Sequence, residues 1–249
     1  MRKRNKSVAA PREDVQAAIS RAWPKGVMEM LFDPNESYFW DVYPKLGTSI
    51  QRLKGAQLLH EIEPEGRPVW YDESDPDEDP PDEPGASRSY HLFFVCPKGD
   101  ISDYTISTEK RAGLDEDGPF GTVNGSGREG WSVSVSLLAP FAVIALSAME
   151  TYEDGSTIEP SMEPVIFNES GERIDPESHF KELRSEEALQ VFLDLRARIS
   201  DLLSKNGIAV LPEEEWRKPV PGLRADAGIL LEVPGGPVRV LDALFFEAL

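Results

Sequence analysis

The sequence predicts an α+β fold: a mostly antiparallel sheet with one N-terminal helix and one long helix near residues 176–206 packed on it. Apolar residues follow the helical period in only two long stretches of the chain. Between these stretches, short apolar or alternating runs are separated by turns rich in Pro and Gly, as strands are. Elements that are grouped rather than alternating favour this class over a doubly wound α/β fold.

The N-terminal helix is predicted from one apolar stripe with the spacing i, i+3, i+4, i+7 and i+8. The stripe consists of Val15, Ala18, Ile19, Ala22 and Trp23. Glu13 and Asp14 stand in the first turn, where the helix dipole favours negative charge. Pro24 and Gly26 end the helix.

The long helix is predicted within residues 176–206, where six apolar residues track the helical period. They are Leu189, Phe192, Leu195, Ile199, Leu202 and Leu203. Gly207 stands where a C-terminal cap belongs. Ser185 is a candidate N-cap that divides the segment.

Strands are predicted in most of the remaining chain. They are 57–63 with 67–71 as one hairpin, 90–96 with 101–108 as another, 131–137, 141–147, 164–168, 208–211, and a closing hairpin of 228–233 with 238–241. The alternation of large apolar residues with serines predicts that 131–137 is half-buried. A buried helix would show the same apolar run as 141–147, so both interpretations stay open there. The glycine-rich stretch 113–130 is predicted to be a flexible loop.

The domain organisation follows from the charge pattern. Residues 1–12 are expected to form a flexible basic tail, and residues 13–249 a single α+β domain. A disordered acidic Pro-rich loop at 72–88 interrupts this domain. Its first thirteen residues hold eight carboxylates, four prolines and no cation, and like charges and prolines both oppose regular structure.

The net charge of -19 excludes several classes of partner. Residues 1–70 carry 11 Lys and Arg against 9 Asp and Glu, whereas residues 71–249 carry 15 against 36. Because nucleic-acid affinity comes from cations that neutralise phosphates, we expect neither a nucleic-acid binder nor a protein bound to an anionic membrane. The sequence has a single cysteine and no apolar signal segment, and its most apolar stretch, 137–149, is too short to cross a bilayer. These features predict a cytoplasmic location.

Catalytic and cofactor motifs are incomplete. The string Gly125 to Gly130 matches G-x-G-x-x-G, but a dinucleotide site needs a helix after it, and a strand is predicted there. Asp75, Asp77 and Asp79 have the spacing of a calcium loop whose turn glycine is replaced by Pro80. No metal and no cofactor are therefore expected.

Cys96 is interpreted as a small buried apolar residue. Its odd separation from His91 places the two side chains on opposite faces of one strand, which weakens any pairing of thiol and imidazole.

Two functions from different classes remain. The first is a non-enzymatic acidic module, of the immunity or accessory type found in bacteria, that binds a basic protein partner. Its binding residues are expected in the acidic loop, at Asp75, Asp77, Glu78, Asp79 and Asp82. The alternative is an enzyme whose site is assembled from distant residues, with His91, Cys96, His179 and the glycine loop 121–130 as candidates. A homo-oligomer formed through the apolar C-terminal segment 244–249 is a third expectation.

Overall fold

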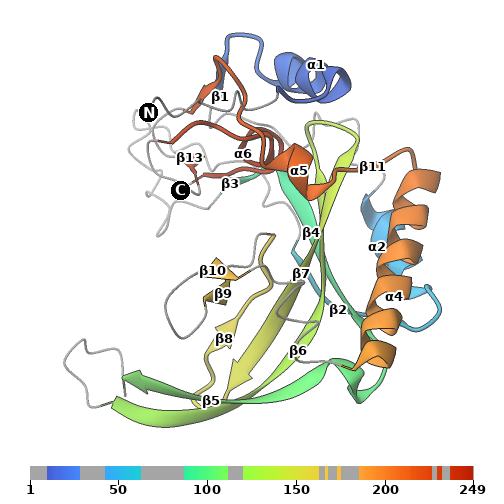
Figure 1. The fold of residues 1–249 in the computed structure, drawn as a ribbon, viewed down its shortest axis with the longest axis vertical. Coiled ribbons are helices and arrows are strands. Elements are labelled where there is room, and N and C mark those ends of the chain that lie inside the picture. Colours follow the sequence, from blue (N-terminus) through green and yellow to red (C-terminus); the bar gives the residue numbers. More distant parts are fainter. Residues whose placement is uncertain are drawn as a thin grey trace, which may run out of the picture.

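The computed structural model describes residues 10–28, 43–62, 87–111, 120–162, 166–167, 173–174, 185–225, 229–231 and 236–248. It confirms the α+β fold, because a mostly antiparallel seven-stranded sheet carries helices on its surface (Figure 1). The strands of this sheet are β2 (Ala56–Ile62), β4 (Tyr90–Pro97), β5 (Asp103–Arg111), β6 (Phe120–Ser136), β7 (Phe141–Tyr152), β8 (Thr157–Ile158) and β11 (Ala209–Val210). Their order is β11-β7-β6-β4-β2, with β5 paired to β6 and β8 paired to β7. Only β11 runs parallel to its neighbour.

Helices lie on two sides of this sheet. The two that face it along its length are α2 (Tyr43–Gln51) and α4 (Glu186–Lys205). At one end of the sheet lie α1 (Glu13–Ala22), α5 (Glu213–Trp216) and α6 (Val240–Leu244) (Figure 1). Each side has its own cluster of buried apolar side chains, one under α4 and the other under α1 and α6.

Short elements complete the described chain. β1 (Val27–Met28) pairs in parallel with β12 (Arg224–Ala225), and β9 (Ile166–Phe167) pairs antiparallel with β10 (Arg173–Ile174). A three-stranded sheet joins β13 (Ile229–Leu230), β14 (Glu247–Ala248) and β3 (Ser87–Arg88). A 3₁₀ turn, η2 (Asp100–Ser102), precedes β5.

Both predicted helices are confirmed. In α1 the apolar stripe is buried, with Val15, Ala18 and Ile19 facing the core. The predicted N-cap of α4 is also present, since the Ser185 hydroxyl accepts the backbone N–H of Ala188. Gly207 follows the helix with a φ of 76°, the left-handed conformation that favours glycine at a helix end.

The predicted hairpin of 90–96 with 101–108 is wrong, although both segments are strands. Val95 pairs with Trp131 and Asp103 pairs with Arg128, so β4 and β5 lie end to end along the same edge of β6. Both are antiparallel to β6 and therefore run in the same direction. The connection between the two strands contains the short helix η2 and does not reverse the direction of the chain.

The predicted half-burial of 131–137 is also wrong. The apolar residues of this stretch face α4, but Ser132, Ser134 and Ser136 on the opposite side are fully buried as well. The C-terminal elements cover that side, and the Ser136 hydroxyl donates to the carbonyl of Leu244 at 2.7 Å. The serines mark a face where the covering chain approaches closely, not a face in water.

The prediction of a flexible glycine-rich loop is wrong for residues 120–130, which form the first part of β6. Aromatic rings occupy the space above its glycines. A Cβ placed on Gly127 would lie 2.3 Å from the ring of Tyr104, and one placed on Gly125 would lie 2.9 Å from the ring of Tyr152. The glycines are therefore sites of close packing within a strand.

The closing hairpin of 228–233 with 238–241 is not formed. Ile229 and Leu230 pair with β14 instead, and residues 240–244 form the helix α6. Asp242 caps this helix by accepting the backbone N–H of Arg239 at 2.7 Å. Arg239 alternates with Val238 and Val240, which is a strand-like pattern, so local pattern alone misassigned the start of this helix.

The open question at 141–147 is answered by β7, a strand that continues to Tyr152. The strand predicted at 57–63 corresponds to β2, and the one predicted at 208–211 to β11. The strand predicted at 67–71 lies outside the described residues. Ser87 and Arg88 belong to β3, so the part of 72–88 without an assigned structure ends before Ser87.

The packing at Gly130 yields a first prediction. A Cβ there would lie 2.6 Å from the Cys96 Sγ and 2.7 Å from the carbonyl oxygen of Val95. We expect Gly130→Ala to lower the free energy of unfolding by about 1–3 kcal/mol, measured by urea denaturation, because overpacking forces the neighbouring strand to shift. The control Ser126→Ala, at an exposed position of the same strand, should change it by about 0.5 kcal/mol or less. Equal stabilities of the two variants would contradict the close approach of β4 and β6 at this point.

Candidate functional site

The predicted partner-binding residues lie outside the described residues, but both flanks of their segment are placed. Ile62 ends β2 before the segment, and Arg88 belongs to β3 after it. Ile62 and Arg88 line one and the same pocket. The two ends of segment 63–86 therefore meet the folded domain close together.

The acidic excess is unevenly divided between the described residues and the rest of the chain. Of the 45 Asp and Glu residues, 20 are described; of the 26 Lys and Arg residues, 19 are described. The described residues are thus close to neutral, while the remaining segments hold 25 acidic and 7 basic residues. The net acidic charge of this protein therefore comes from residues outside the described ranges.

Within the described residues, many carboxylates are paired with cations. Asp103 contacts Arg128 at 2.7 Å, and Glu213 contacts Arg217 at 2.8 Å. Asp201 contacts Lys205 at 2.6 Å on the surface of α4. These pairs give the described surface a mixed charge pattern.

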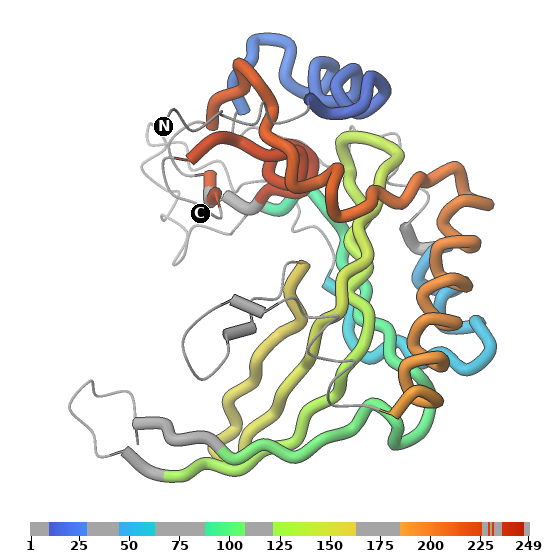
Figure 2. The backbone as a smooth tube through the Cα atoms, in the orientation of Figure 1, coloured from blue at the N-terminus to red at the C-terminus, as the bar shows by residue number. Residues whose placement is uncertain are grey.

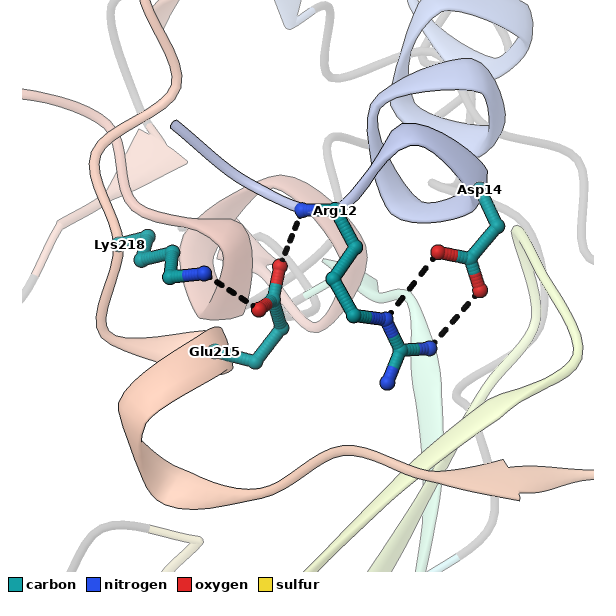
Figure 3. Close-up of polar contacts among 4 residues, drawn as sticks. All are labelled: Arg12, Asp14, Glu215 and Lys218. Atoms are coloured by element: carbon teal, nitrogen blue, oxygen red, sulfur yellow. Dashed lines mark hydrogen bonds and ion pairs between the residues drawn. The ribbon is translucent and has the colours of Figure 1, made fainter. Parts of the chain in front are cut away.

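One buried carboxylate joins the N-terminal segment to α5 (Figure 3). Glu215 is 3% exposed; its Oε1 accepts the backbone N–H of Arg12 at 2.6 Å, and its Oε2 accepts the Lys218 ammonium at 2.6 Å. The Arg12 side chain turns away and contacts Asp14 at 2.8 Å. Because both oxygens of Glu215 serve the start of α1 and its own helix, its role is structural.

His91, a candidate of the enzyme hypothesis, lies in the core. Its imidazole stacks on Phe93 with ring centroids 4.3 Å apart, and its Nε2 lies 2.9 Å from the Glu61 carboxylate. Burial lowers the pKa of His91 from 6.5 to about 4. The imidazole is therefore neutral at physiological pH.

Cys96 lies on the opposite face of β4 from His91, as the sequence predicted. It is fully buried, and burial raises the pKa of its thiol to about 12. A thiol of this kind is a poor nucleophile, which agrees with its interpretation as a small apolar core residue. The glycine stretch is part of β6, and His179 lies outside the described residues. Of the described candidates of the enzyme hypothesis, Gly130 lies against the Cys96 Sγ, whereas His91 lies on the opposite face of β4.

Sequence reasoning missed a polar cluster across three strands. The Tyr104 and Tyr152 hydroxyls both donate to the Glu150 carboxylate, at 2.8 and 2.6 Å. Burial and this carboxylate raise the pKa of Tyr104, and the hydrogen bond to Glu150 raises the pKa of Tyr152 to about 12. The two phenols bridge over the glycines of β6, so the only sequence signal for them was the glycine run itself.

The C-terminal segment packs into the core of its own chain. Leu244, Phe245 and Phe246 are at most 2% exposed, and the Phe246 ring meets Trp23 with centroids 5.5 Å apart. These three side chains are not available to a second copy of the chain.

Comparison with known proteins gives no relative: no family model, curated protein or solved structure matches this chain. Within the described ranges, no group of three or more His, Cys, Asp or Glu side chains is arranged to hold a metal ion. No helix in that part of the chain combines the length and apolarity needed to cross a bilayer.

The burial of His91 predicts a pH-dependent stability. Between pH 6.5 and 4 the unfolded state binds a proton at His91 that the folded state does not, so stability falls as the pH falls through this window. The loss attributable to His91 is about 3 kcal/mol when complete. We expect His91→Phe, which keeps a ring on Phe93, to lose less stability than the wild type in urea unfolding between pH 7 and 4.5.

Two results would contradict this account of His91. Parallel pH profiles of the wild type and His91→Phe would mean that burial does not control the proton. A wild type that gains stability relative to the variant at low pH would mean that an ion pair with Glu61 outweighs burial.

The cluster around Glu215 predicts a second difference in stability. Glu215→Ala leaves a partly buried ammonium and a backbone N–H without their acceptor, so the free energy of unfolding should fall by about 1–3 kcal/mol. The matched control is Asp14→Ala, whose ion pair with Arg12 is exposed and should contribute about 0–1 kcal/mol. Chemical denaturation of both variants checks this order, and a larger effect at Asp14 would reverse our assignment.

Proposed function

We propose that this chain is a non-enzymatic protein-binding module whose acidic segments bind a basic protein partner. A module of this kind would be an immunity-type or accessory protein. The observation that carries the proposal is the separation of charge, with a near-neutral described fold and 25 acidic against 7 basic residues elsewhere.

This separation supports binding in a specific way. Carboxylates that serve the fold are paired with cations of the fold, as Asp103 is with Arg128. The carboxylates of Asp72 to Pro84 have no cation in their own segment. A concentrated anionic segment accelerates association with a cationic partner and makes that association sensitive to salt.

The enzyme alternative receives less support from the described residues. His91 and Cys96 point to opposite faces of β4, each into a separate core cluster. The chemistry required of them is also disfavoured, because burial makes the imidazole a weak base and keeps the thiol protonated. A site that includes His179 would have to be built without them.

The proposal predicts that neutralising the acidic segment slows association. The variant replaces each of five residues by its amide: Asp75, Asp77, Glu78, Asp79 and Asp82. A partner is first captured from extracts of the source organism on the immobilised wild type and identified. Its association rate with the variant should then fall about tenfold or more at low ionic strength, with a flatter dependence on salt.

The matched control carries the same change of charge on the described fold. It replaces by glutamine five exposed glutamates that form no ion pair with another described residue: Glu13, Glu153, Glu186, Glu187 and Glu214. Because the charge change is equal, any effect of net charge alone appears in both variants. If the two variants associate with the partner equally fast, the acidic segment is not the contact.

A further inference from the structure

The outer edge of β5 carries no further strand in the described part of the chain. Figure 2 shows β5 and β6 running together along one margin of the sheet, away from the C-terminal elements. β5 pairs with β6 along all nine of its residues and with no other described strand. One row of its backbone N–H and C=O groups therefore points away from the sheet.

This edge lacks the features that usually prevent a further strand from adding to a sheet. The edge strand β2 has such features, because its pairing with β4 shifts in register between Leu58 and His60, and α2 packs against it. β5 contains no proline, and its register with β6 is unbroken. Its exposed side chains Thr105 and Ser107 are short and uncharged. A regular edge of this kind is a template for another strand.

Side-chain contacts hold β5 in place within its own sheet. The Tyr104 hydroxyl reaches across β6 and donates to the Glu150 carboxylate of β7 at 2.8 Å. Asp103 contacts Arg128 of β6 at 2.7 Å. Because the strand is already ordered by these contacts, a partner that adds to its edge does not have to order it.

The order of charges along β5 favours an antiparallel copy of β5 as the added strand. β5 begins with Asp103 and ends with Glu109, Lys110 and Arg111. A parallel copy would place each of these four residues opposite itself, and like charges directly opposite each other destabilise a strand pair. An antiparallel copy places the acidic start opposite the basic end. Asp103 keeps its contact with Arg128, so the antiparallel arrangement is favoured by the absence of repulsion.

Charge and length together select the register of this antiparallel pair. With Ile106 on the two-fold axis, Asp103 would lie opposite Glu109 of the second copy, which places two like charges together. With Ser107 on the axis, Asp103 lies opposite Arg111 of the second copy, and all nine residues of β5 pair. Alternate pairs exchange two hydrogen bonds each, so this ladder has about eight to ten backbone hydrogen bonds.

From this edge we propose that β5 pairs antiparallel with β5 of a second copy of this chain, with Ser107 of both copies on the two-fold axis. The two sheets then become continuous, and the interface is isologous. Because each copy contributes one strand edge, the buried area lies at the low end of specific interfaces and the dimer is weak. The interface uses neither the acidic segment of the proposed function nor the buried C-terminal segment, so it does not depend on them.

Disulfide formation between copies of the full chain locates the two-fold axis. Cys96 is the only cysteine of the sequence and is fully buried, so it does not compete. Ser107→Cys places two thiols directly opposite each other. The matched control Thr105→Cys is exposed on the same strand, but its two thiols lie about 14 Å apart along the strands. Under mild oxidation, Ser107→Cys should form the linked dimer at least about tenfold faster on non-reducing gels, because a disulfide needs close Cβ atoms.

Two lysine variants test the same register without a covalent bond. Ser107→Lys places two like charges together on the axis, whereas Thr105→Lys places each lysine opposite Glu109 of the second copy. Both variants add the same charge at an exposed position of β5. Sedimentation velocity is measured at physiological ionic strength, where a Debye length of about 8 Å screens the repulsion between the two acidic chains. Ser107→Lys should weaken the dimer about tenfold or more, and Thr105→Lys should associate at least as tightly as the wild type.

Three results would overturn the proposal: a wild type that stays monomeric at about 1 mM, equal rates of cross-linking for the two cysteine variants, or equal association of the two lysine variants. A dimer that neither lysine variant changes would be held by another surface. Circular dichroism and the unfolding midpoint of each variant check that its fold is retained. Neutralising the acidic segment does not weaken this dimer, so this proposal and the proposed function fail independently.

Discussion

The burial of both faces of the second part of β6, residues 131–136, is the constraint on which the rest of the fold depends. On one face the Trp131 indole donates to the carbonyl of Phe192 in α4, at 2.9 Å. On the other face the serines admit the C-terminal chain, and the Ser136 hydroxyl reaches the carbonyl of Leu244. The residue types differ because the covering elements differ: a helix with large side chains fits against large residues, and a close backbone fits against small ones. The first and last parts of the chain can complete the core only because this middle strand has room for them.

The sequence predicted the elements whose signals are local. The helices α1 and α4 were predictable because their apolar stripes and caps stand within a few residues of each other, as Ser185 and Ala188 do. Strand existence was predictable for β4 for the same reason, whereas the apolar run of β7 left a buried helix equally open. Strand pairing was not, since whether β5 pairs with β4 or with β6 depends on where the chain goes after Gly99, and no local pattern records that. Residues 238–241 were misassigned on another ground, because Arg239 alternates with apolar neighbours as in a strand, although a helix capped by Asp242 begins there.

The candidate sites were less predictable than the fold, and the glycines of β6 show why. In the sequence they resemble a phosphate-binding or flexible loop, yet Gly125 and Gly127 make room for tyrosine rings from neighbouring strands, and Gly130 makes room for β4. A glycine in a strand indicates that another group occupies the space of its missing side chain, but the sequence does not identify that group. The pocket lined by Arg88 and Arg239 is similar, because these residues lie far apart in the sequence and only the fold brings them to one place. Charge, by contrast, is additive along the sequence, and the acidic segment was evident from composition alone.

The described residues are nearly neutral and the acidic residues lie elsewhere, so the two groups differ in how much a substitution costs in stability. The connection from Ile62 to Ser87 adds 24 residues between two strands that are already held by other partners. Loop-closure entropy grows only with the logarithm of length, by about 0.6 kcal/mol for each doubling, so the charge and length of this connection vary at little cost to the fold. Glu215 and Asp242 have no such freedom, since replacing either leaves buried donors without acceptors. In the proposed function, the charges that gather in this segment without a balancing cation contact a partner outside the chain. Charge needed only for solubility would serve as well if it were spread over the exposed faces of α4 and β6.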